Sequence, residues 1–198
     1  MGFQIDDGKG GGKSAEVDGN NRLNVRSVES TSAQSATDDE DSYNINSGLV
    51  TITTTDEQGV LYLKNNETRD FKITAFVVIL GPSTGGSATD TTRVRVYKNP
   101  TTGTLISEAN AADTNSNRNF SSSKTFTADV YKGDGSSTVT DGTVHIESLV
   151  SPGNRVFFGI DEVLTNGDSI AITYEANDSN TSMKAMAAII GHLRNVNE

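Results

Sequence analysis

The chain has 198 residues, a formal net charge of −10, 33% apolar residues and 19 glycines, and it contains no cysteine. This acidic balance argues against nucleic acid and anionic membranes as partners, because binding to either depends on lysine and arginine. The lack of cysteine excludes disulfides, thiolate zinc sites and cysteine nucleophiles. The low apolar fraction predicts a thin core, which suits a two-sheet sandwich or a core completed by neighbouring subunits.

Residues 1–48 differ in composition from the rest of the chain. The glycine-rich run Lys9–Lys13 is typical of a flexible tether, and Leu23 and Val25 alternate with polar residues as in a short strand. A later polar stretch contains four consecutive acids, Asp38–Asp41, whose mutual repulsion predicts a solvated segment. We interpret residues 1–48 as an extended N-terminal arm with one strand; a disordered tail is the alternative for this composition.

From Leu49 onward, short runs of alternating apolar and polar residues are separated by glycine, proline and asparagine turns. The most apolar run ends at Gly81-Pro82, where proline removes a backbone donor. Met183–Leu193 is ambiguous between helix and strand, and its β-rich context favours a strand. The predicted strands are Leu49–Thr54, Gly59–Lys64, Phe71–Leu80, Arg93–Lys98, Lys124–Lys132, Thr143–Val150, Arg155–Ile160, Ser169–Ala176 and Met183–Leu193. Strands of this number and spacing predict an all-β sandwich or barrel in residues 49–198.

The sequence contains few groups suited to catalysis or metal binding. Gly8–Ser14 lacks the first glycine of a phosphate loop, because residue 7 is Asp7, and no strand–helix pattern surrounds it. The only histidines, His145 and His192, are expected to be surface or interface residues, since no nucleophile-elbow motif accompanies them.

Adjacent acidic residues occur at Asp6-Asp7, Asp38–Asp41, Asp56-Glu57 and Asp161-Glu162. Neighbours on a strand point to opposite faces, so these runs give no evidence for a glycosidase pair. Asp18–Asn21 and Asp134-Gly135 resemble calcium-loop fragments, but neither matches the twelve-residue frame, and ordinary turns explain both. We therefore predict no enzyme activity, no catalytic or metal-binding residue and no cofactor.

Several segments in about the first 100 residues follow a distinctive order. A glycine-rich start precedes Ala15–Arg26, and Asp41–Gly48 and Leu61–Glu67 then lead into the apolar run Phe71–Leu80. This order resembles small virion structural proteins of tailed bacteriophages, a group that includes capsid decoration (cement), head-associated and tail-associated proteins. The resemblance carries over no catalytic residue.

The resemblance implies a jelly-roll-like β-sandwich in residues 49–198 that forms a homo-oligomer, expected to be a homotrimer. It also implies that the protein is made in the bacterial host cytoplasm and is located on the capsid surface of the virion. Its expected function is to decorate and stabilise the capsid by bridging subunits of the major capsid protein, without nucleic acid or membrane as a partner. The arm, residues 1–48, would add a strand to a neighbour's sheet, with Leu23, Val25 and Val28 as its assembly contacts.

Two alternatives remain open at this point. A phage tail, fibre or head-fibre component has the same kind of sequence and differs in its position on the particle. A receptor- or glycan-binding adhesin predicts that Tyr97, Phe120 or Tyr131 lines a groove at a loop-rich end of the domain.

Overall fold

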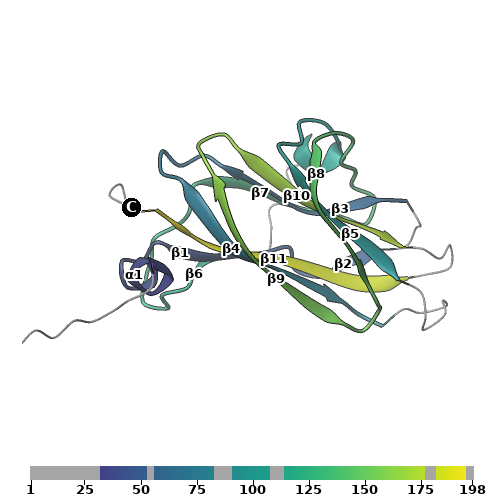
Figure 1. Ribbon diagram of the computed structural model, residues 1–198, viewed down its shortest axis with the longest axis horizontal. Coiled ribbons are helices and arrows are strands. Elements are labelled where there is room, and N and C mark those ends of the chain that lie inside the picture. The colour runs from purple at the N-terminus through teal and green to yellow at the C-terminus, as the bar shows by residue number, and fades with distance from the viewer. Residues whose placement is uncertain (1–31, 53–55, 83–90, 108–113, 177–181, 195–198) are drawn as a thin grey trace, which may run out of the picture. The chain divides into compact units, whose positions relative to one another are not determined.

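A computed structural model of the chain describes residues 32–52, 56–82, 91–107, 114–176 and 182–194. These residues are mostly β-strand and form two antiparallel sheets packed against each other (Figure 1). The predicted all-β sandwich is therefore confirmed. Leu23, Val25 and Val28 lie outside the described residues, so the strand in residues 1–31 stays a prediction.

The first sheet has six strands in the order β6-β1-β11-β4-β9, with β2 also paired to β11. Its strands are β6 (Thr114–Asn117), β1 (Ser42–Asn46), β11 (Met183–Leu193), β4 (Phe71–Leu80), β9 (Arg155–Leu164) and β2 (Val50–Ile52). The second sheet has five strands in the order β7-β3-β10-β5-β8. Its strands are β7 (Ala128–Lys132), β3 (Gln58–Asn65), β10 (Ser169–Ala176), β5 (Thr92–Lys98) and β8 (Thr143–Val150). Two short helices accompany the sheets, α1 (Ser32–Asp38) and α2 (Thr104–Ser107).

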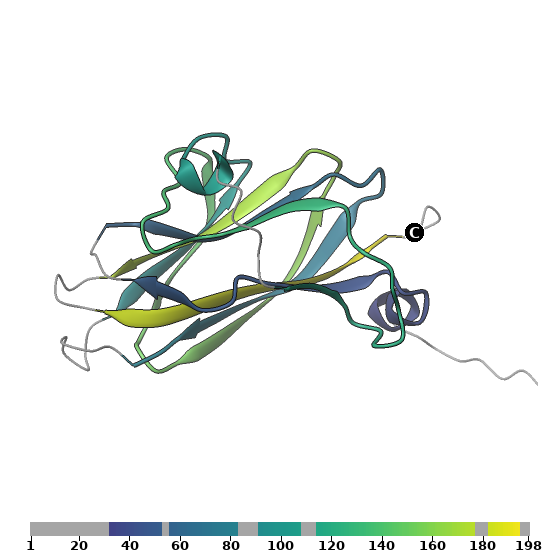
Figure 2. The ribbon, with the colours of Figure 1, turned by 180° about the vertical axis from the view of Figure 1, so that it is seen from behind.

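Strand pairing is nested along the chain. β1 and β2 pair with β11, β3 with β10, β4 with β9, and β5 with β8, always antiparallel. Successive strands from β2 to β5, and again from β8 to β11, alternate between the two sheets (Figure 2). The chain therefore follows the path of a long two-stranded ribbon folded over on itself. β6 and β7 come from the segment between β5 and β8 and widen the sheets beside β1 and β3.

Ser47 connects β1 to β2 along one edge of β11. Its N–H donates to the carbonyl of Ala187 at 2.9 Å, and its hydroxyl oxygen accepts from the N–H of Ala187 at 3.0 Å. Gly48 follows with a φ of 65°, in the left-handed region that glycine adopts at low cost. A side chain thus continues the hydrogen-bonding pattern across the gap between β1 and β2, which holds both strands on the same partner.

The core lies between the two sheets and contains an aromatic stack. The ring of Phe126, just before β7, lies 5.4 Å from the ring of Tyr43 on β1 and 4.5 Å from the ring of Phe71 on β4. All three side chains are buried. Tyr43 and Phe71 belong to the first sheet, and Phe126 leads into β7 of the second sheet, so their packing ties the two layers together at this end of the sandwich.

Periodicity located most of the strands. The predicted bounds of Phe71–Leu80, Thr143–Val150, Ser169–Ala176 and Met183–Leu193 are those of β4, β8, β10 and β11. Met183–Leu193 is a strand, and along its first half buried residues alternate with more exposed ones, as expected when every second side chain faces the core. The sequence pattern did not predict α1, β1, α2 or β6.

β1, at Ser42–Asn46, lies before the expected boundary at residue 49 and is a strand of the first sheet. β1 pairs with both β11 and β6, and its Tyr43 and Ile45 are buried in the core. Asp41 is also buried, at 7% exposure, and forms an ion pair of 2.9 Å with Arg69. The expectation of a fully solvated acidic run was wrong for Asp41, because a cation distant in the sequence neutralises it.

Candidate functional site

β8 and β9 are the outer strands of the two sheets on one side of the sandwich, and four residues of chain connect them. Within the described residues, neither strand has a partner on its outer side. The large exposed apolar side chains on these strands are between 37% and 61% exposed: Val144, Leu149, Phe157 and Val163. The only others in the described ranges are Leu49 and Phe120. We call β8 and β9 the open edge, since exposed apolar residues on the outer strands of a sheet mark a contact surface.

The core is also incompletely covered at the open edge. Four inward-facing residues here are packed against the core but only partly buried: Ile146, Val156, Phe158 and Ile160. Val150 and Leu164, at the strand ends, are buried. Strands in the middle of each sheet, such as β10 and β4, bury nearly all their inward side chains. An additional strand or subunit placed along this edge would remove apolar surface from water at about 25 cal/mol per Å².

An ion-pair cluster joins the two strands of the open edge. Glu162 on β9 lies 2.7 Å from Nε2 of His145 on β8 and 3.0 Å from Nζ of Lys98 on β5. The hydrogen bond from Lys98, followed by the attraction of His145, lowers the pKa of Glu162. His145 is therefore a bridging residue at the surface, as its position on a strand predicted. It has a carboxylate beside it but no serine nucleophile in the contacts described.

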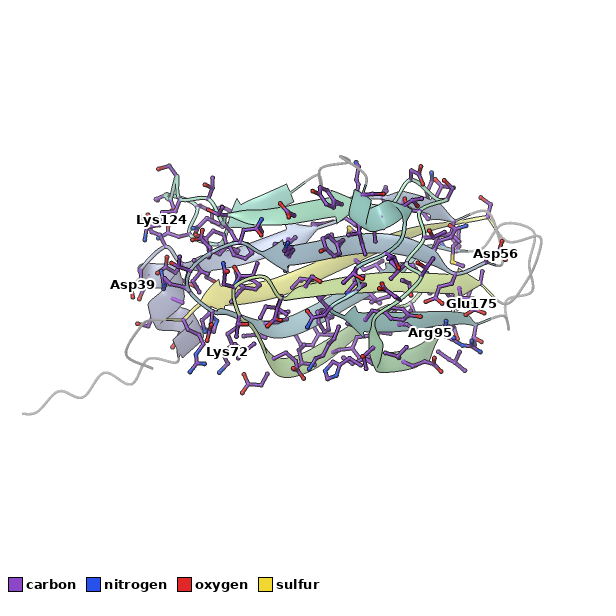
Figure 3. The ribbon with its side chains drawn as sticks, turned by 90° about the horizontal axis from the view of Figure 1, so that it is seen from above. Asp39, Asp56, Lys72, Arg95, Lys124 and Glu175 are labelled. Carbon is purple, nitrogen blue, oxygen red and sulfur yellow. The ribbon has the colours of Figure 1, made fainter. Side chains whose placement is uncertain are left out.

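A second charged cluster lies on the outer face of the five-stranded sheet. The guanidinium of Arg95 lies 2.7 Å from Glu147 and 3.0 Å from Glu175, and it also contacts Glu57. Arg95 and Glu175 are labelled in Figure 3. The hydroxyl of Tyr97 donates to Glu57 at 2.9 Å. Burial raises the pKa of Tyr97, and hydrogen bonding to Arg95 lowers the pKa of Glu147. Acids already satisfied by a guanidinium and hydroxyls are poor general bases, so this cluster fits a structural role.

The three aromatic residues singled out for ligand binding do not share a groove. Tyr97 and Tyr131 pack over the outer face of the five-stranded sheet, around Tyr62, whose ring is stacked 5.7 Å from that of Tyr131. Phe120 lies in the loop after β6, fully exposed, beside a hollow of about 420 Å³ that neither tyrosine lines.

A further hollow of about 450 Å³ opens beside α2. Its lining residues are Tyr62, Lys64, Asn99, Pro100, Thr101, Ile106, Gly167, Asp168 and Ser169. The polar groups here bond to each other: Asn99 donates to Asp168 at 3.2 Å and accepts from the N–H of Ser169 at 2.8 Å. The pKa of Asp168 is lowered, chiefly by the hydroxyl of Thr165. A turn held by these bonds explains the arrangement, and no perturbed acid–base pair lines the hollow.

His192 differs from its expected position. It lies in β11, between β1 and β4, and is 2% exposed, so the prediction of a surface or interface residue was wrong. β11 is an inner strand of its sheet and α1 packs against it, which encloses a polar residue that the sequence pattern assigned to the surface.

The described residues contain neither a metal site nor a membrane-spanning helix. Within the described ranges, no three His, Cys, Asp or Glu side chains are arranged to hold a metal ion. Among the same residues there is no helix long and apolar enough to cross a membrane. No known family model matches the chain, and no curated protein is significantly similar to it. The fold itself defines the class as a two-sheet antiparallel β-sandwich.

Proposed function

We propose that the chain is a non-enzymatic virion structural protein of a tailed bacteriophage, which decorates the capsid and stabilises it by bridging major capsid subunits. The observation that carries this proposal is the open edge, where two neighbouring outer strands leave both backbone hydrogen-bonding groups and apolar side chains uncovered. A protein that works by binding to copies of itself and to a lattice needs such an edge. A hydrolase would need convergent acid–base groups instead.

The nested pairing of β1 and β2 with β11, β3 with β10, β4 with β9 and β5 with β8 supports a jelly-roll assignment, which is a common fold of capsid proteins. The charge of −10 supports a role at high copy number, because like-charged subunits stay soluble until they reach their site. We accordingly propose a homo-oligomer, expected to be a trimer, at the capsid surface, with the arm contributing Leu23, Val25 and Val28 to the contact.

The alternative functions predict different positions and ligands. A tail, fibre or head-fibre component would use the same open edge and differ only in copy number on the particle. A glycan-binding adhesin receives less support, because Tyr97 and Tyr131 pack around Tyr62 while Phe120 lies beside a different hollow. Its test is a glycan array probed with the purified full-length chain, in which a specific hit would favour it.

The proposal is tested by co-sedimentation with capsids assembled from the major capsid protein of the phage that encodes the chain. We expect the full-length chain to bind at many copies per capsid and a variant lacking residues 1–28 to fold but not bind. The matched control removes only residues 2–13, which deletes the glycine-rich tether and keeps Leu23, Val25 and Val28. Equal binding by the full-length chain and the variant lacking residues 1–28 would refute the role of the arm, and few copies at one vertex would favour the tail or fibre alternative.

A further inference from the structure

The outer side of β9 has the features of an acceptor for an added strand. Residues Arg155–Gly159 pair with β4 in unbroken register, so their outer backbone groups form a regular row. β8 is less suitable, because its register with β5 shifts around His145, where Tyr97 pairs with Val144 and Val96 with Ile146. Such a bulge twists an edge away from further pairing. The first half of β9 is therefore the better template of the two strands.

We propose that residues 22–28 of one copy pair, as an added antiparallel strand, with β9 of a second copy of this chain. This inference deepens the arm contact proposed above, and rests on it for the strand character of the segment. It names the acceptor, which the function proposal leaves open. The contact would make the homo-oligomer an exchange of arms between subunits.

The alternation in the segment matches the two faces of β9. Leu23 and Val25 would share the inner face, next to the partly buried Val156 and Phe158, and would complete the cover of the core at that edge. The residues between and beside them, Arg22, Asn24 and Arg26, would then share the outer face with Phe157 and Asp161, which are both exposed there.

Charge supports this orientation. The segment 22–28 contains two arginines and no acid, in a chain whose net charge is −10. An arginine over the ring of Phe157 would gain a cation–π contact, and one beside Asp161 would gain an ion pair. The same segment placed with its arginines inward would bury two charges against Val156 and Phe158.

The geometry indicates a second copy as the donor. The chain enters the sheet at Asp41, whose carbonyl accepts from the N–H of Leu193, at the end of the sheet opposite to Arg155. An antiparallel strand on β9 would place residue 28 beside Arg155. That position is about 30 Å from Asp41 along the sheet and, four strand spacings away, about 19 Å from it across the sheet. Residues 29–31, α1 and the turn after it lie between residue 28 and Asp41. Because the N–H of Asp41 donates to the carbonyl of Ala36 at 2.7 Å, this stretch spans only about 27 Å. A chain therefore cannot supply this strand to its own β9.

The absence of cysteine from the chain allows a direct cross-linking test. Asn24→Cys and Arg26→Cys variants, which cover two registers on the same face, are each mixed with a Phe157→Cys variant and oxidised mildly. The matched control partner is Leu149→Cys on β8, which is exposed to the same degree, at 61% against 59% for Phe157. We expect an Asn24→Cys or Arg26→Cys chain to form a disulfide with the Phe157→Cys chain. We expect no such disulfide when the partner is the Leu149→Cys chain.

A second measurement tests the backbone contact. Asn24→Pro removes a ladder donor and should shift the purified full-length chain from an oligomer to the monomer mass in sedimentation, whereas Ser14→Pro should not. Preferential cross-linking to Leu149→Cys, no cross-link with either partner, or a link formed only within one chain of an Asn24→Cys/Phe157→Cys double variant would each overturn the inference.

These experiments need no particle, so they separate the two proposals. The chain could bind capsids through its arm and yet form no cross-link to Phe157→Cys. That result would support the decoration function and refute this contact. Cross-linking to Phe157→Cys by a chain that does not bind capsids would establish the contact and refute the decoration function.

Discussion

The hydroxyl of Tyr174 on β10 donates to the main-chain carbonyl of Met186 on β11 at 2.9 Å, and so links the two sheets through the core. Tyr174 is fully buried, and this burial raises the pKa of its hydroxyl, which therefore stays protonated as a donor. A polar group at this depth is tolerated because it has a partner. The bond also fixes how the inner strands of the two sheets align.

Replacing Tyr174 with phenylalanine keeps the ring and removes the hydrogen bond to Met186. We expect the free energy of unfolding to fall by about 1–2 kcal/mol, measured by urea denaturation with an unchanged m-value. Tyr131→Phe is the control, because that ring is partly buried and stacks on Tyr62. Equal losses in the two variants would show that the bond to Met186 contributes nothing specific.

Two glycines in the same sheet differ in the space around them. A Cβ at Gly191 on β11 would lie 2.5 Å from the carbonyl oxygen of Lys72, whereas a Cβ at Gly159 on β9 would have no neighbour closer than 3.8 Å. We expect Gly191→Ala to destabilise the fold by about 1–3 kcal/mol and Gly159→Ala to be neutral or stabilising by about 0.5 kcal/mol. Thermal unfolding of both variants measures the difference, and a stable Gly191→Ala protein would contradict the close contact.

The carboxylate of Asp141 accepts hydrogen bonds from Thr101 and Thr102 at the turn before β8. It lies 2.5 Å from the hydroxyl of Thr101 and 2.7 Å from its N–H. These bonds, the Thr101 hydroxyl first, lower the pKa of Asp141 to about 2. We expect a carboxyl carbon titration by NMR to give that value, and Thr101→Val to move the pKa of Asp141 back toward the ordinary 3.8.

The sign of the corresponding stability change follows from linkage. Because the pKa of Asp141 is lower in the folded state, the ionised group stabilises the fold above pH 3.8, and this contribution is lost as the pH falls toward 2. Asp141→Asn should therefore weaken the fold at neutral pH and differ little from the parent chain near pH 2. A constant difference across this range would contradict the assignment.

Arg95 neutralises acids on β8, on β10 and just before β3. Arg95→Met would leave Glu57, Glu147 and Glu175 close together without their common cation. We expect a loss of about 1 kcal/mol at neutral pH, a modest value because charges near the surface are screened by water. The loss should shrink as the pH falls, since Arg95 lowers the pKa of Glu147 in the folded state and protonation removes the repulsion.

Denaturation of Arg95→Met at neutral and acidic pH measures this effect. Arg118→Met is the control, because Arg118 is exposed in the loop after β6. A larger loss for Arg118→Met, or a loss from Arg95→Met that grows as the pH falls, would show that the cluster on the sheet face is not held by this guanidinium.

The candidate contact surface could be predicted only in part. The sequence identified the strand segments Thr143–Val150 and Arg155–Ile160, and the alternation of His145 with its neighbours placed that residue at the surface, where it contacts Glu162. Nothing in the local pattern of β8 or β9 distinguishes an outer strand from an inner one. Their partners, which come from elsewhere in the chain, make that distinction.

The sequence by itself determined the class of fold and the bounds of strands such as β4 and β11, because alternation with period two is a local property of the chain. Only the tertiary structure decided that β1 joins the first sheet, that Asp41 and His192 are buried, and that β8 and β9 are outer strands, each paired on one side only within the described residues. Those outcomes depend on contacts between residues far apart in the sequence. A cation, helix or strand from elsewhere in the chain changes the free-energy cost of burying a polar group.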